Sequence, residues 1–198
     1  MTEIEQLETD IQQKIARLNE LRKASSPKPV KNYEFKTLEG TVSLLSLFGD
    51  KTVLFAIHNM GQGCRYCTLW ADGLNAFLSH LESRFAVVLL SKDPPELQRA
   101  FANERGWRFR MASHGGGDYI SEQSVAPGES NMPGMVCYER EGDQVVKKNV
   151  ATFGPGDLYC SIWHVLSLAG VGEENWTPQY AYWRRPQKMD DGGLNVLQ

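Results

Sequence analysis

Two cysteines, Cys64 and Cys67, lie between a continuous apolar run and a stretch with helical periodicity. The apolar run at residues 52–57 predicts a strand that is buried on both faces, and the helical pattern begins near Thr68. This order places the first cysteine where a loop opens a helix, so that unpaired backbone N–H groups and the helix dipole stabilise an anion. Because the thiolate is the reactive form of cysteine, the pair is a candidate redox centre.

Three interpretations of the cysteine pair are open. A zinc site needs about four ligands, but the remaining cysteines, Cys137 and Cys160, are distant in sequence and expected in the core. The pair could also be two small buried residues that only contribute packing. Thiol–disulfide exchange fits the order of strand, loop, cysteine pair and helix: Cys64 attacks a substrate disulfide and Cys67 resolves the mixed disulfide. Arg65 adds a nearby positive charge, and no bound cofactor is required.

Composition limits the classes of protein to consider. A chain of 198 residues with 41% hydrophobic content can form one domain with an accessory segment or two. The net charge of -3 and the absence of a block of like charge argue against nucleic acid or an anionic membrane as partner. The acidic start and the lack of a long apolar stretch predict a cytoplasmic protein, in which a close cysteine pair is catalytic or metal-binding rather than a structural disulfide. The expected partner is a protein or small molecule carrying a thiol or a disulfide.

The chain divides into three predicted segments. Residues 1–31 hold an amphipathic helix and a connector, residues 32–170 the main domain, and residues 171–198 an aromatic and basic tail expected to dock on that domain. The apolar face of the helix consists of Ile4, Leu7, Ile11, Ile15, Leu18 and Leu21. This face either covers the core of its own chain or pairs two copies in a homodimer.

Strands and helices alternate through the main domain. A hairpin is expected at residues 33–45, and further strands at 53–57, 85–90, 107–112, 134–138 and 144–150. Helices are expected after the cysteines, from the Asp93-Pro94-Pro95-Glu96 start to Gly106, and at residues 158–169. A loop is expected at residues 113–130. Helices that cross between neighbouring strands predict an α/β fold with a mixed sheet covered on both faces.

Several motifs resemble the thioredoxin-like superfamily. The dipeptide Met132-Pro133 precedes a strand, where that fold places a cis proline opposite the cysteine pair and uses the preceding residue to bind substrate backbone. A closer resemblance is to a bacterial thioredoxin-like family catalogued as a domain of unknown function. The resembling pieces are Tyr33-Glu34-Phe35, Gly40 to Leu44, Gly63 to Gly73, Glu104 to Trp107 and Met132 to Gly134. The resemblance implies a thioredoxin-like mixed sheet flanked by helices.

Two departures qualify the activity that the resemblance implies. Residues 58–63, upstream of Cys64, lack the proline and the threonine or serine with which peroxiredoxins activate peroxide, so at most a weak peroxidase is expected. Thioredoxins place Gly-Pro between their cysteines, where this chain has Arg65 and Tyr66. The redox potential is therefore open. The alternative is a protein without catalytic activity, in which the thioredoxin-like domain serves as an interaction module or a redox sensor.

Three more residues are candidate supports of the site. His58, at the end of the predicted strand, could orient a thiolate, carry a proton, join the cysteines as a metal ligand, or be a satisfied buried histidine. Trp70 could be helix core or could line a substrate groove. Asp72, two residues after Trp70, could be an acid that supports the site or an exposed helix residue, and the exposed position is expected.

Overall fold

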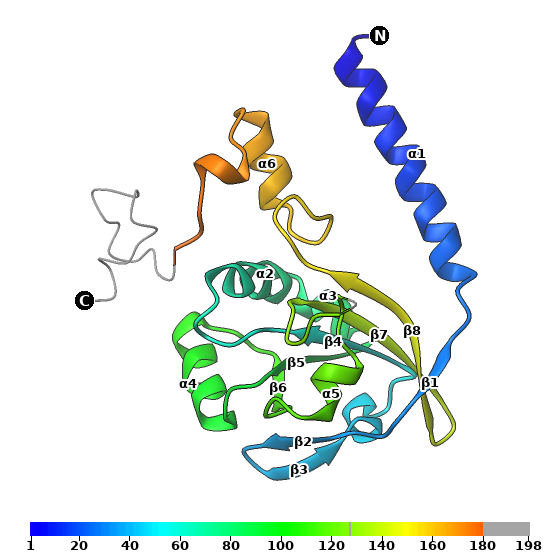
Figure 1. The fold of residues 1–198 in the computed structure, drawn as a ribbon, viewed down its shortest axis with the longest axis vertical. Coiled ribbons are helices and arrows are strands. Elements are labelled where there is room, and N and C mark those ends of the chain that lie inside the picture. Colours follow the sequence, from blue (N-terminus) through cyan, green and yellow to red (C-terminus); the bar gives the residue numbers. More distant parts are fainter. Residues whose placement is uncertain (127, 180–198) are drawn as a thin grey trace.

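The sheet is the centre of the computed structural model, which describes residues 1–126 and 128–179 (Figure 1). The described residues form an eight-stranded mixed sheet with the strand order β1-β8-β7-β4-β5-β6-β2-β3. The strands are β1 Lys28–Val30, β2 Glu34–Thr37, β3 Gly40–Ser43, β4 Val53–His58, β5 Ala86–Ser91, β6 Arg110–Ser113, β7 Gly134–Glu141 and β8 Gln144–Thr152. Strands β4, β5 and β6 are parallel, and the remaining pairings are antiparallel. The predicted α/β class and thioredoxin-like mixed sheet are confirmed.

Helices lie on both faces of this sheet, and the crossovers between the parallel strands β4, β5 and β6 are helical. The helices are α1 Glu3–Lys23, α2 Arg65–Ala76, α3 Leu78–Glu82, α4 Pro95–Arg105, α5 Asp118–Glu122 and α6 Ile162–Leu168, with short 3-10 turns η1 Leu45–Phe48 and η2 Glu173–Asn175. None of the helices in the described part of the chain is both long and apolar enough to cross a membrane. Of the predicted tail, residues 180–198 lie outside the described residues, while Trp176 packs edge-on against Trp163 of α6.

Alternation along the strands divides the core in two. On one face Leu54 and Ala56 of β4 pack with Tyr119 of α5. On the other face Ile57 packs with Trp70 and Leu74 of α2. Because successive side chains of a strand point to opposite faces, the α2 face and the α5 face receive different residues from the same strand.

Helix α1 begins with a capping box in which Thr2 and Glu5 bond each other's backbone N–H, and it has no buried residue. It projects away from the sheet in Figure 1. The connector predicted after α1 contains a short strand, β1, which pairs with β8. Pro29 is tolerated there because β1 is at the sheet edge, where a missing N–H breaks no second ladder.

Three local predictions were wrong. The helix after the cysteines is interrupted at Phe77, which has non-helical φ and ψ and is 41% exposed, so α2 and α3 are separate. The sequence predicts that helix α4 buries Leu97, Ala100 and Phe101, but it buries Gln98 and Ala102, whereas Leu97 and Ala100 are exposed. The predicted loop at residues 113–130 contains α5, whose Tyr119 and Ile120 are buried. A helix of five residues is too short to show a clear period in the sequence.

Candidate active site

Cys64 is the N-cap residue of α2, as the sequence predicts. Its Sγ accepts the backbone N–H of Cys67 at 3.1 Å, and its carbonyl accepts the backbone N–H and the hydroxyl of Thr68. A sulfur at this position lies at the positive end of the helix dipole, where a negative charge is stabilised. The site can therefore favour a thiolate on Cys64.

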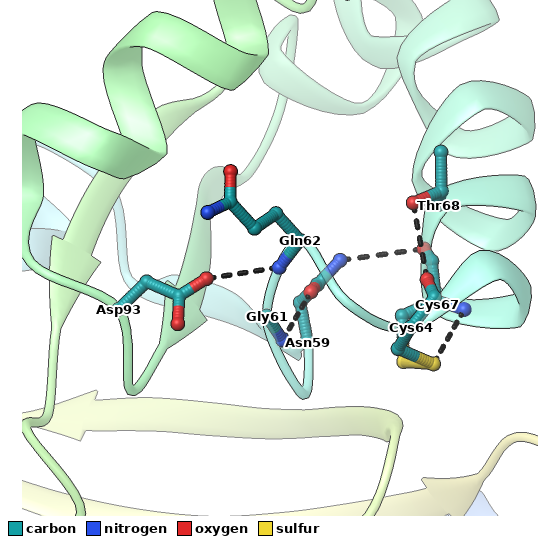
Figure 2. The surroundings of a disulfide bond; sticks show 7 residues. All are labelled: Asn59, Gly61, Gln62, Cys64, Cys67, Thr68 and Asp93. Atoms are coloured by element: carbon teal, nitrogen blue, oxygen red, sulfur yellow. Dashed lines mark hydrogen bonds between the residues drawn. A yellow bond between two sulfur atoms is a disulfide. The ribbon is translucent and has the colours of Figure 1, made fainter. Parts of the chain in front are cut away.

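Cys67 lies one helical turn further on and forms a disulfide with Cys64, with the two Cα atoms 5.2 Å apart (Figure 2). Cys67 is only 2% exposed, whereas Cys64 is partly exposed. The two thiols therefore differ in access: a large reactant can reach the sulfur of Cys64 more readily than that of Cys67. Arg65 occupies the first helical position between them and is partly exposed.

The loop at residues 59–64 is held in place by two side chains that the sequence reasoning missed. Asn59 is buried; its amide donates to the carbonyl of Cys67 at 3.3 Å and its side-chain oxygen accepts the N–H of Gly61 at 2.8 Å. From the other side, the Asp93 carboxylate accepts the N–H of Gln62 at 2.9 Å (Figure 2). Asp93 was expected to cap α4, but the cap position belongs to Pro94 and has no side-chain hydrogen bond.

Gly61 is required by the same arrangement. Its φ of 111° is a conformation that L side chains rarely adopt. A Cβ there would lie 2.7 Å from a carboxylate oxygen of Asp93. The close approach of Asp93 to the loop backbone thus depends on glycine at this position.

Aromatic rings pack around the first turn of α2. Tyr66 is partly buried and stacks on Trp163 of α6, with ring centroids 6.2 Å apart and an interplanar angle of 25°. Trp70 is 3% exposed and lies between Tyr66 and Phe153. Trp70 is therefore a core residue in this structure, and the residue between the cysteines that faces an aromatic neighbour is Tyr66.

Asp72 is not the exposed helix residue that was expected. Its carboxylate binds the Arg105 guanidinium through two nitrogens and accepts the indole N–H of Trp107 at 2.7 Å. The Arg105 guanidinium also lies over the Trp107 ring. These contacts connect the middle of α2, at the Ala-Asp-Gly motif, to the end of α4, at the Arg-Gly-Trp motif.

His58 lies on the α5 face of the sheet, opposite the face covered by α2. Its Nε2 is 2.8 Å from the Tyr119 hydroxyl, which is in turn 3.2 Å from the Tyr138 hydroxyl. Burial lowers the pKa of His58 to about 3, with His114 and Lys147 as further positive neighbours, and burial lowers the pKa of His114 to about 4. The interpretation as a buried histidine fits this placement best, with Nε2 bonded to Tyr119 and Nδ1 buried without a hydrogen-bond partner among the described residues.

The metal interpretation loses its support. His58 and the cysteines lie on opposite sides of β4, because side chains alternate along the strand. Across residues 1–126 and 128–179, no group of three or more histidine, cysteine, aspartate or glutamate side chains could hold a metal ion.

Pro133 lies at the end of the sheet where β4 finishes and the cysteine loop begins. Strand β7 runs antiparallel to β4, so that Gly134 pairs with His58, and the Pro133 carbonyl accepts the N–H of Phe153. The described residues contain no cis peptide bond, so the bond between Met132 and Pro133 is trans, unlike the bond that the resemblance implies. Trans is the favoured isomer by about 0.5–1 kcal/mol for a bond to proline.

The other two cysteines differ from Cys64. Burial raises the pKa of Cys137 to about 11, and burial also raises the pKa of Cys160 above its ordinary value. Neither participates in a disulfide. At neutral pH both are therefore neutral thiols with low reactivity.

The sheet order, the helices on both faces and a cysteine pair at the N-terminus of α2 define a thioredoxin-like protein. Comparisons with solved structures agree. Peroxidoxin BcpB from Mycobacterium tuberculosis has a TM-score of 0.51 and 19% identity, covering 65% of this chain and 85% of that one. A Bacteroides thetaiotaomicron protein provisionally assigned as a protein disulfide isomerase has a TM-score of 0.51 and 18% identity, covering 71% and 86%. A cysteine-to-serine mutant of Xanthomonas campestris peroxiredoxin Q has a TM-score of 0.52 and 14% identity, covering 70% and 92%.

Within this class the chain belongs to a particular family. Residues 3–189 match the model of the bacterial protein family of unknown function DUF899. This match confirms the resemblance drawn from the motifs around the cysteines. No curated protein matches the sequence.

Proposed function

We propose that the protein is a thiol–disulfide oxidoreductase that uses Cys64 as the attacking thiol and Cys67 as the resolving thiol. The observation that carries the proposal is the asymmetry of the pair: Cys64 is the partly exposed N-cap of α2, and Cys67 is buried one turn behind it. The helix terminus would stabilise the thiolate that attacks, and burial would hide the second thiol from unrelated disulfides. The substrate would be a protein or small-molecule disulfide, and the setting the cytoplasm.

The exchange would take place in two steps. The Cys64 thiolate attacks one sulfur of the substrate disulfide, forms a mixed disulfide, and releases the other substrate sulfur as a thiolate. The Cys67 thiolate then attacks the sulfur of Cys64, closes the intramolecular disulfide, and releases the second substrate thiol. A thiol reductant returns the disulfide to the dithiol, so each cycle moves two electrons.

Neighbouring residues have supporting roles in this proposal. Asn59 holds the carbonyl of Cys67 and the loop, and thereby fixes the distance between the two sulfurs. Arg65 contributes positive charge beside the thiolate, and Tyr66 is held against Trp163. Met132 and Pro133, at the same edge of the sheet, would meet the substrate backbone. His58 would act only through the packing under that edge.

The first test is an equilibrium titration of the protein in glutathione buffers, with free thiols trapped and counted by mass. The expected result is one reversible two-electron transition that is lost in Cys64→Ser and in Cys67→Ser but kept in Cys137→Ser. Cys67→Ser should accumulate one glutathione adduct on Cys64, because the resolving thiol is missing. A pair that forms no disulfide at any glutathione ratio would refute the proposal and favour the non-catalytic module.

A peroxidase is a weaker second candidate, favoured only by the peroxiredoxin-like fold. The loop before Cys64 supplies no proline, threonine or serine to activate peroxide. Peroxide consumption that depends on Cys64 would support it, and slow consumption equal to that of Cys64→Ser would remove it.

A further inference from the structure

The apolar face of α1 is uncovered. Ile4, Leu7, Ile11 and Leu21 are each more than half exposed, and only Ile15 and Leu18 are partly buried. The helix contacts the rest of the chain near its C-terminal end, where Arg22 meets Tyr159 and the Arg22 carbonyl accepts from Asn149. Isolated helices are marginally stable in water, so a helix with a complete apolar face requires a second surface.

The spacing of this face is that of a two-stranded coiled coil. Ile4, Ile11 and Leu18 occupy one heptad position (a), and Leu7, Lys14 and Leu21 occupy the other (d). A single polar residue such as Lys14 in this seam selects register and orientation at some cost in stability. Its aliphatic stem can cover apolar surface while the ammonium reaches a neighbouring carboxylate.

The charges of α1 are divided along its length. The first half carries only acidic side chains, Glu3, Glu5, Glu8 and Asp10, and the second half carries Lys14, Arg17, Arg22 and Lys23 with one acid, Glu20. Two parallel copies in register would place Glu3 beside Glu8 of the other helix and Arg17 beside Arg22, so like charges would meet at both flanks. Two antiparallel copies would place acidic halves against basic halves.

We infer that α1 pairs with α1 of a second copy of this chain in an antiparallel coiled coil. In that pairing Ile4 meets Leu21, Leu7 meets Leu18, and Ile11 meets Lys14 of the other helix. Asp10 and Arg17, both at the flanking position g, then form two symmetric ion pairs. The Lys14 ammonium reaches toward the acidic half of its partner.

This orientation determines how the two domains are arranged. Each domain is attached at the C-terminal end of its α1, so an antiparallel pair holds the domains at opposite ends of a rod of about 30 Å. The inference concerns α1 alone and stands or falls separately from the proposed redox activity.

The test is sedimentation equilibrium of the full chain and its charge variants across a wide concentration series. The full chain should be a dimer in equilibrium with monomer. Arg17→Asp should weaken dimerisation about tenfold, because it turns both Asp10 pairs repulsive, and Asp10→Arg should do the same. The double variant D10R/R17D should restore the association of the original chain. Glu20→Arg, with the same charge change on the outer face, is the matched control for Asp10→Arg and should have no effect.

The outcomes separate the alternatives. A parallel dimer would be tightened by Arg17→Asp, because the introduced carboxylate would then meet Arg22 of the other helix, and this result would overturn the inference. A chain that stays monomeric at all concentrations would overturn it as well. So would a dimer that is insensitive to the charge changes. Ile11→Gln, which removes one exposed apolar side chain from the seam, should weaken the dimer while leaving the unfolding of the monomeric domain unchanged.

Discussion

The buried histidines His58 and His114 predict that this fold loses stability as the pH falls through the mildly acidic range. Burial lowers their pKa values to about 3 and about 4, below the ordinary value of 6.5. Between these values the unfolded chain binds protons that the folded chain does not, so the free energy of unfolding rises with pH. The stabilisation is fully present above pH 6.5 and is lost progressively as the pH falls toward the folded pKa of each histidine.

The magnitude follows from the proton uptake. At about pH 5 a histidine that stays neutral in the folded chain costs about 2 kcal/mol relative to about pH 7.5, since each pKa unit corresponds to about 1.4 kcal/mol. This cost depends only on the pKa of the histidine in the unfolded chain, as long as its pKa in the folded chain is well below the pH of the measurement. The two histidines together amount to about 4 kcal/mol, which is a large part of the stability of a typical domain.

The assay is urea unfolding followed by tryptophan fluorescence at several pH values from about 7.5 to about 5, the range in which an ordinary histidine titrates. His58→Gln keeps a hydrogen-bonding group beside Tyr119 but does not titrate, and it should halve the pH dependence. His80→Gln is the control, because His80 is exposed, and it should leave the pH dependence unchanged. A free energy of unfolding that is flat over this range would refute the view that both histidines are buried in the neutral form.

Three further predictions concern the loop, the helix contacts and the thiols. Gly61→Ala should lower the free energy of unfolding by about 1–3 kcal/mol and slow mixed-disulfide formation. Gly63→Ala is the control and should do neither, because a Cβ there meets nothing within 4 Å. Equal effects of the two substitutions in urea unfolding and thiol-exchange assays would contradict the role of the Asp93 contact. Asp72→Ala should cost about 1–3 kcal/mol in urea unfolding by leaving Arg105 and Trp107 without this carboxylate, and a neutral result would contradict it. After reduction, iodoacetamide at neutral pH should modify Cys64 before Cys137, and peptide mapping that found equal rates would contradict the raised pKa of Cys137.

The fold and the cysteine position were predictable from sequence because they rest on local patterns. Residues 53–57 form a continuous apolar run, and the hairpin at residues 134–152 has strand-like sequences on both sides of a turn. The C-x-x-C pair between a strand and a helix fixes Cys64 at the helix start, where the structure has it. The N-terminal helix was also predictable, from its regular spacing and its Thr2 and Glu5 cap.

The surroundings of the cysteines were not predictable, because they depend on contacts between distant elements. Asp93 has the sequence pattern of a helix cap, yet its carboxylate binds Gln62 of a different loop. His58 could have faced either side of the sheet, and only the register of β4 directs it to Tyr119. The one available signal for Asn59 was its position directly after a buried strand, where a polar residue must find backbone partners.

The anchoring of the cysteine loop has a consequence for how this scaffold can be varied. Asn59 and Asp93 follow the ends of the neighbouring strands β4 and β5, so the sheet itself dictates where the sulfur of Cys64 lies. Both anchors come from outside the segment between the cysteines, which holds Arg65 and Tyr66. A combinatorial library at these two positions should therefore vary the reduction potential while the anchors of the loop stay in place, separating the electrochemistry of the site from the position of its sulfur.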